Sequence, residues 1–201
     1  AIGEPPSSRG YTPSVFSLLP QLLERAGNNE HGSITGLFNV LVEGDDINDP
    51  VADAARSVLD GHLVLSRELA AQNHYPAIDV LESVSRLSHD LLDSQRREAM
   101  GEAREMLAIY KKSRDLISIG AYQSGSNSKI DRSIELYNSL NDFLRQNMGE
   151  GCSLEQSWKA LEDTLNMGED KSAAHRDFGT PDALQRPGGI SGSTPPVGES
   201  T

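Results

Sequence analysis

The sequence predicts an α/β unit with part of a parallel sheet, followed by a small all-α domain and a disordered tail. Three observations lead to this prediction. Residues 34–42, ITGLFNVLV, form a nearly continuous apolar and β-branched run, typical of a strand buried on both faces of a parallel sheet. From His89 onward, apolar residues recur at three- and four-residue spacing, as in amphipathic helices. From Ser172 to Thr201 the chain is rich in Gly, Pro, Ser and Thr without an apolar period, which predicts disorder.

The first helix is expected to begin at Thr12 and Pro13. The threonine hydroxyl can cap free amides, and proline fits the first helical position because its missing N–H leaves no bond unmade. We expect this helix to adjust at Pro20 and to end at Gly27, a residue that favours helix C-termini.

A second helix is predicted after the run at 34–42, because Asp49 and Pro50 form a start signal. After Gly61, residues 62–66 form a second short apolar run that predicts a buried strand. Strand, helix and strand in this order predict a parallel pair joined by a right-handed crossover.

Three amphipathic helices are predicted in the all-α domain, the third with a capping box at Ser153 and Gln156. We divide the chain into an α/β portion at 1–88, a helical domain at 89–167 and a disordered tail at 168–201. The periodic apolar residues are Ala99, Ala103, Met106, Leu107, Tyr110 and Ile117, then Ile130, Ile134, Tyr137, Leu140 and Leu144, then Leu154, Trp158, Leu161 and Leu165.

The charge balance restricts the partners. A net charge of -12 and a pI near 4.8 argue against nucleic acid and against an anionic membrane surface, since both would repel the chain. No apolar run approaches the roughly twenty residues that span a bilayer, and no signal-peptide pattern begins the sequence. The single Cys152 cannot form an internal disulfide, so we expect a cytoplasmic protein.

Three segments carry a family resemblance: NHYPAIDVLESVSR at 73–86, GDDINDP at 44–50 and DGHLVLSR at 60–67. From residue 1 to about 165 the chain resembles the catalytic-type subunits of rotary ATP synthases, and most closely the flagellum-specific and type III secretion ATPases. The resemblance implies the C-terminal portion of a RecA-like nucleotide-binding domain followed by a helical C-terminal domain. Since the chain lacks an initiator methionine, we expect the C-terminal part of a longer protein.

Arg86 is the strongest catalytic candidate. A guanidinium offers five donors in a planar fork that can stabilise charge on a phosphoryl group held by a neighbouring subunit. The resemblance implies that the arginine of the VSR sequence, Arg86, is an arginine finger acting in trans within a ring. From the residues alone, Arg86 pairing with Glu82 or with a helix C-terminus on the surface is the alternative.

Tyr75 is the candidate for nucleotide binding, because the resemblance implies that the tyrosine of the YPA sequence packs on the adenine base of its own subunit. An aromatic residue before a proline also suits ordinary core or turn packing. The resemblance places a second wall of the base pocket near residues 146–148, without assigning a residue there.

The acidic loop contains Asp45, Asp46, Asn48 and Asp49. Clustered carboxylates suit hard cations, but the spacing does not fit a calcium loop. The resemblance implies a loop that lines the ring and contacts a central stalk protein, with Asp49 also capping the next helix. A solvated acidic turn is the alternative.

A phosphate-binding loop of the form GxxxxGK[ST] is absent from the sequence. The resemblance places the groups that bind the phosphates of ATP and the Mg²⁺ ion upstream of this portion, so we expect this chain alone to be inactive. The parent protein is expected to be a homo-hexamer that hydrolyses MgATP to energise flagellar or type III protein export. Its expected partners are the central stalk protein, and export substrates and chaperones at the helical domain, with membrane association only through the export gate.

Two alternatives remain. A rotary ATP synthase catalytic subunit is disfavoured because residues 120–126, GAYQSGS, stand where that subunit has a strongly acidic element. A noncatalytic acidic interaction module with an α/β part and a helical part would also lack a phosphate-binding loop.

Overall fold

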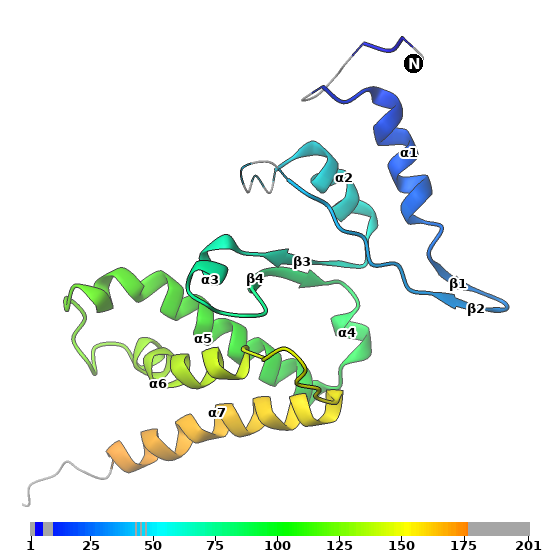
Figure 1. Cartoon of the computed structure of the whole chain (residues 1–201). Coiled ribbons are helices and arrows are strands. Elements are labelled where there is room, and N and C mark those ends of the chain that lie inside the picture. Colours follow the sequence, from blue (N-terminus) through cyan, green and yellow to red (C-terminus); the bar gives the residue numbers. More distant parts are fainter. Residues whose placement is uncertain (1–2, 6–9, 43, 45, 47, 177–201) are drawn as a thin grey trace, which may run out of the picture.

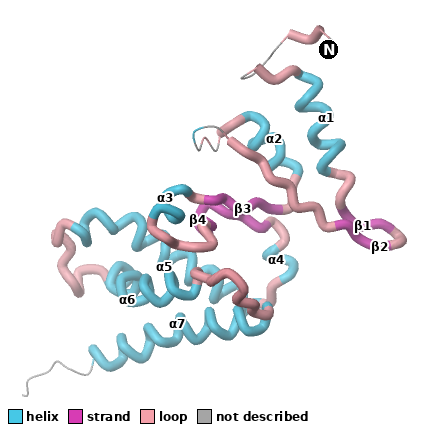
Figure 2. The backbone as a smooth tube through the Cα atoms, in the orientation of Figure 1, coloured by secondary structure: helices cyan, strands magenta, loops and turns pink. Residues whose placement is uncertain are grey.

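The computed structural model describes residues 3–5, 10–42, 44, 46 and 48–176. An extended N-terminal part leads into a bundle of long helices (Figures 1 and 2). In chain order the elements are α1 (Pro13–Leu23), β1 (Gly27–Asn29), β2 (Gly32–Ile34), α2 (Pro50–Val58), β3 (Gly61–Leu65), α3 (Arg67–Ala71), β4 (Ile78–Ser85), α4 (Ser88–Leu91), α5 (Ser94–Ser118), α6 (Ser128–Phe143) and α7 (Leu154–Arg176).

Helix α1 begins where the sequence predicts, with Pro13 in its first turn. The predicted hydroxyl cap is wrong, because the Thr12 side chain makes no capping bond and its Oγ1 instead lies 2.9 Å from the Ser14 Oγ. Pro20 is accommodated inside the helix. The helix ends at Leu23, and Gly27 begins the first strand with a φ of 138°, a backbone conformation that glycine tolerates.

The predicted buried strand at 34–42 is wrong. Only Ile34 is in a strand, where it closes an antiparallel hairpin of β1 and β2 by pairing with Gly27. The rest of the run has no regular structure, and Leu37 and Leu41 are 95% and 90% exposed. A strand needs a neighbouring strand to bond its backbone, and a strand buried on both faces also needs layers packed above and below the sheet. Among the described residues no strand pairs with this run.

The strand predicted after Gly61 is confirmed as β3, but its predicted burial is wrong, since Leu63 and Leu65 are 72% and 73% exposed. The predicted parallel crossover is also wrong for the described residues. β3 pairs with β4 in antiparallel orientation, with His62 opposite Val84 and Val64 opposite Asp79. The sequence analysis did not identify β4. Because the run at 34–42 forms no strand beside β3, the nearest partner is the segment that returns after α3.

The three predicted helices of the all-α domain are confirmed as α5, α6 and α7. The capping box is also confirmed, since the Ser153 amide donates to the Gln156 Oε1 at 2.9 Å and the Gln156 amide donates to the Ser153 Oγ at 3.2 Å. The helices share one apolar core, formed by Ala99, Ala103, Met106, Leu136, Leu140, Leu161 and Leu165.

Helix α7 continues to Arg176, beyond residue 168 where the sequence analysis begins its disordered tail. Disorder is therefore wrong for residues 168–176. The rest of that tail, residues 177–201, lies outside the described residues. Among the residues that the structure describes, no helix is both long and apolar enough to cross a membrane.

Candidate functional site

Strand β4 separates the two strongest site candidates. Tyr75 lies before its first residue and Arg86 directly after its last. A regular strand of eight residues spans roughly 26 Å, and the irregular pairing of β4 shortens that span. The two residues therefore flank opposite ends of the strand.

Tyr75 is 53% exposed, so core packing does not account for it. A cis peptide bond joins Tyr75 to Pro76. The carbonyl of Tyr75 accepts a hydrogen bond from the Gln146 amide at 2.9 Å, which places the loop after α6 beside it. An exposed ring held next to a loop of the helical domain is able to stack on a planar base.

The loop after α6 is held in shape by bonds to Glu150. The Gln146 Nε2 donates to the Glu150 carbonyl at 2.8 Å, and the Asn147 amide donates to the Glu150 Oε2 at 2.7 Å. The intervening Met148 is fully exposed. The structure thus brings the expected second wall, residues 146–148, to Tyr75, although it does not single out one side chain as the wall.

Arg86 is exposed and lies against the end of helix α2. Its amide donates to the Asp60 carbonyl at 2.8 Å, and its Nη2 donates to the Arg56 carbonyl at 3.0 Å. The Arg56 carbonyl is one of the last four carbonyls of α2, and these accept no hydrogen bond from an amide within the helix. This arrangement is the helix C-terminus contact given as the alternative, and Glu82 instead lies 4.0 Å from the Lys111 ammonium.

A wide bulge distorts β4 between Tyr75 and Arg86. Four residues, 80–83, face the single Leu63 of β3. Asp79 holds the start of the bulge, because its Oδ1 accepts the Leu81 amide at 2.9 Å. Ser83 holds the other end, since its buried Oγ donates to the Asp79 carbonyl at 2.6 Å and accepts the Val64 amide at 2.9 Å.

The acidic loop is described only in part, since Asp45 lies outside the described residues. The Asp46 Oδ1 accepts the Asn48 amide at 2.9 Å. Asp49 is 7% exposed, and its Oδ1 accepts the Val51 amide at 2.9 Å and the Ala52 amide at 3.3 Å, so its predicted capping role is confirmed. Within the described part of the chain, no three His, Cys, Asp or Glu residues gather as a metal site.

Comparison with known families decides the identity. Residues 1–85 match the nucleotide-binding domain of the ATP synthase alpha/beta family. Residues 92–163 match the T3SS EscN ATPase C-terminal domain. The chain belongs to the flagellar and type III secretion ATPases. The predicted family is therefore confirmed, and so is the fold class of a nucleotide-binding α/β portion followed by a helical domain.

Relatives of this ATPase chain are similar over most of its length. The flagellum-specific ATP synthase of Bacillus subtilis is 51% identical over 161 residues, which are 80% of this chain and 37% of that protein. The assembled ATPase EscN of the enteropathogenic E. coli type III secretion system has a TM-score of 0.79 and 43% identity over 81% of this chain and 40% of that one. EscN in complex with its central stalk EscO has a TM-score of 0.73 and 40% identity over 81% of this chain and 38% of that one. The chain thus spans well under half the length of these proteins.

One residue beside the candidate site was not predicted from the sequence. Arg104 of α5 donates to three carbonyls of the β4 bulge, those of Val80, Leu81 and Ser83. The signal available in the sequence is a seven-residue spacing of basic residues, Arg97, Arg104 and Lys111, which puts them on one face of α5.

Proposed function

We propose that the protein carrying this chain hydrolyses MgATP in a homo-hexameric ring and energises flagellar or type III protein export. In this proposal Tyr75 packs on the adenine of its own subunit, and Arg86 completes the site of the next subunit. The observation that carries the proposal is the position of Tyr75 and Arg86 at opposite ends of β4 in a chain of this ATPase family.

Tyr75 binds the base because the residue is about half exposed and its backbone is held by Gln146. Stacking on an aromatic ring contributes about 0.5–1.5 kcal/mol beyond burial of area. The loop at 146–150 closes the second side. Its attachment to the helical domain makes base binding sensitive to the position of that domain.

Arg86 stabilises charge on the phosphate of the neighbouring nucleotide. In the isolated chain its guanidinium gives up one donor to the Arg56 carbonyl, a neutral acceptor. The guanidinium is a cation in both bonds, but a phosphate also carries negative charge and can accept two parallel N–H bonds from the guanidinium. An arriving phosphate therefore outcompetes the Arg56 carbonyl and moves the guanidinium off the end of α2.

ATP and Mg²⁺ are the proposed cofactors. The residues described fit the base end of the nucleotide, at Tyr75, and the charge of a neighbour's phosphate, at Arg86. The chain has no GxxxxGK[ST] loop to bind β- and γ-phosphates, so this polypeptide alone is expected not to hydrolyse ATP. When bound, Mg²⁺ would neutralise phosphate charge during transfer.

Solved structures of a relative support the proposed assembly, because EscN has been solved in assembled form and in complex with its central stalk. We assign stalk contact to the acidic loop of Asp45, Asp46, Asn48 and Asp49. Asp49 is buried at the start of α2, so its proposed role is to hold the loop in place. The exposed Asn48, together with Asp46, is proposed to contact the stalk. The helical domain at 89–167 is proposed to meet export substrates and chaperones, in the cytoplasm at the export gate. Residues 1–88 are proposed to serve the nucleotide, and residues 168–201 follow the helical domain in the sequence.

Subunit mixing tests the proposal directly in the full-length protein. Tyr75→Ala damages a subunit's own pocket, and Arg86→Ala damages the pocket of its neighbour. In an equal mixture of the two variants, about one quarter of the interfaces pair an intact pocket with an intact finger, so activity returns above that of either variant alone. If Arg86 served its own subunit, each variant would carry one defect per site and mixing would restore nothing.

A further inference from the structure

One face of α5 contacts residues earlier in the chain. Arg97, Arg104, Lys111 and Arg114 form this basic stripe, since residues three or seven positions apart share a helix face. Each contacts a residue earlier in the chain. Arg97 donates to the His89 carbonyl at 3.0 Å, Lys111 lies 3.4 Å from the Asp79 carboxylate, and Arg114 lies 3.2 Å from that of Glu68.

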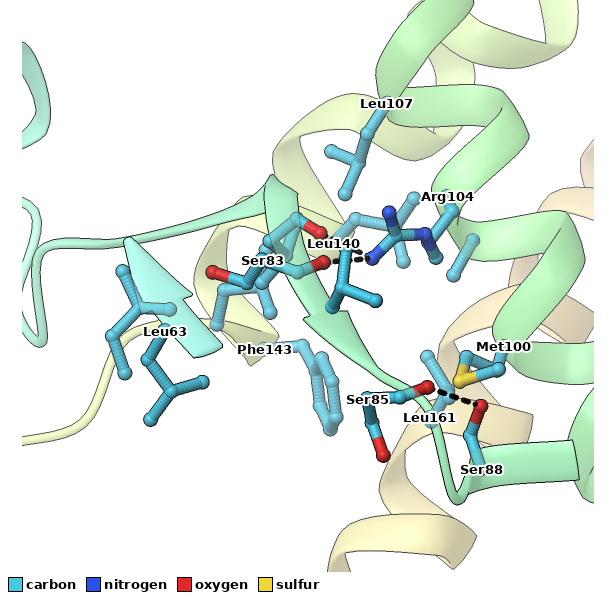
Figure 3. Close-up of a pocket in the computed structure, with 15 residues that line it drawn as sticks. Leu63, Ser83, Ser85, Ser88, Met100, Arg104, Leu107, Leu140, Phe143 and Leu161 are labelled. Carbon is cyan, nitrogen blue, oxygen red and sulfur yellow. Dashed lines mark hydrogen bonds between the residues drawn. The ribbon is translucent and has the colours of Figure 1, made fainter. Parts of the chain in front are cut away.

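Arg104 differs from the other members of the stripe because it binds three backbone carbonyls of β4. Its Nη1 donates to the carbonyls of Val80 and Ser83, the latter at 3.3 Å, and its Nη2 donates to that of Leu81 at 3.1 Å. The side chain is half-buried. Figure 3 shows its guanidinium directed at the bulge beside Ser83.

The bulge explains why these carbonyls need a donor. Residues 80–83 have only Leu63 opposite them on β3, so their carbonyls are not all used by the ladder between the strands. A carbonyl left unpaired away from water costs free energy, and the planar fork of an arginine satisfies several at once. A lysine offers a point charge without that fork.

The apolar contact around Arg104 is incomplete. A cavity of about 500 Å³ lies between β4 and the helices, lined by Leu63, Val84, Met100, Leu107 and Phe143 among others (Figure 3). This space is partly open to solvent, so apolar contact between β4 and α5 is incomplete there. The hydrogen bonds of Arg104 join the bulge to α5, next to the ion pair of Lys111 with Asp79.

We propose that Arg104 is a positioning residue, which fixes the β4 bulge to α5 and thereby sets where Arg86 is presented, three residues beyond Ser83. Movement of the helical domain then changes the position of Arg86, although α5 does not contact the nucleotide. This inference rests on the proposed role of Arg86 in trans.

The test uses Arg104→Met in the full-length protein, with ATP turnover and nucleotide affinity measured separately. The kcat is expected to fall roughly three- to thirtyfold with nucleotide affinity unchanged, as for a site coupled through another residue. Arg104→Lys should be reduced in the same parameter, because lysine lacks the fork. Arg132→Met is the matched control, since it removes an arginine that pairs with Glu102 inside the helical domain and is expected to keep wild-type turnover.

Mixing identifies the subunit in which the defect acts. If Arg104 positions the finger, Arg104→Met is rescued by Tyr75→Ala subunits and not by Arg86→Ala subunits. Rescue by Arg86→Ala subunits would place the defect in the subunit's own base pocket, and rescue by neither would make Arg104 a general stabiliser of the fold. Either result overturns the inference, as does a wild-type kcat. Failure of Arg86→Ala and Tyr75→Ala to rescue each other would instead overturn the proposed function itself.

Discussion

The backbone amide of Gln146 donates a hydrogen bond to the carbonyl of Tyr75, with an N···O distance of 2.9 Å. This bond connects residues 71 positions apart and joins the loop after α6 to the approach to β4. The helical domain thus contacts the segment before β4 through Gln146, and β4 itself through Lys111 at Asp79 and Arg104 at the bulge. Both ends of the proposed site therefore depend on the position of that domain.

Gln146→Pro removes the amide donor, so the loop is no longer bonded to Tyr75. Adenine nucleotide binding is expected to weaken severalfold, because one hydrogen bond contributes about 1 kcal/mol net. Isothermal titration of the full-length protein with ADP measures this. Gln146→Ala is the control, since it keeps the amide and loses only the side-chain bond to the Glu150 carbonyl. Equal affinities for the two variants would show that the backbone bond does not support the base pocket.

Arg86→Ala is expected to reduce kcat by roughly 10³-fold or more in the full-length protein and to leave nucleotide affinity nearly intact, since the finger acts on charge that develops at transfer. Arg86→Lys keeps the charge without the fork and should recover only part of the rate. Steady-state turnover and equilibrium binding separate the two effects. A normal turnover rate in Arg86→Ala would remove the finger assignment.

Tyr75→Ala is expected to weaken adenine nucleotide binding about tenfold, because stacking contributes about 0.5–1.5 kcal/mol and the ring also buries area. Tyr75→Phe retains the ring and should bind nearly as well as the wild type. Competition between ATP and GTP is a useful second measurement, as loss of the ring should lower discrimination between bases. Unchanged affinity in Tyr75→Ala would return this ring to a packing role.

Asp49→Ala is expected to lower the free energy of unfolding by about 1 kcal/mol, because two amides at the start of α2 lose their acceptor. Asp49→Asn should retain most of that stability, since asparagine is also a good N-cap. Urea unfolding measures both. By contrast, Asn48→Ala should leave the free energy of unfolding unchanged and weaken stalk binding. Loss of stability in Asn48→Ala with normal stalk binding would contradict the division of roles within the acidic loop.

Leu136→Ala is expected to lower the free energy of unfolding of the helical domain by about 2–5 kcal/mol, because this side chain is 1% exposed in the shared core of α5, α6 and α7. Leu116→Ala is a matched control, since Leu116 is 51% exposed and its truncation should change stability by less than about 0.5 kcal/mol. Thermal unfolding followed by circular dichroism compares the pair. Similar losses for both variants would contradict the core assignment.

The sequence by itself determined the features that depend on neighbours a few residues away. The periods of α5, α6 and α7 follow from spacing within one helix, and the caps at Asp49 and Ser153 bond residues two or three positions along the chain. The family resemblance pointed to Tyr75 and Arg86 through short local motifs.

Tertiary structure decided the features that depend on distant partners. The run at 34–42 has the composition of a buried strand, yet it is exposed because no described strand pairs with it. Arg104 looks like an ordinary helical surface residue in the sequence, and only the β4 bulge gives it three carbonyls to bind. Pairing of β-strands and satisfaction of backbone carbonyls are settled between segments far apart in the chain, so local composition does not determine them.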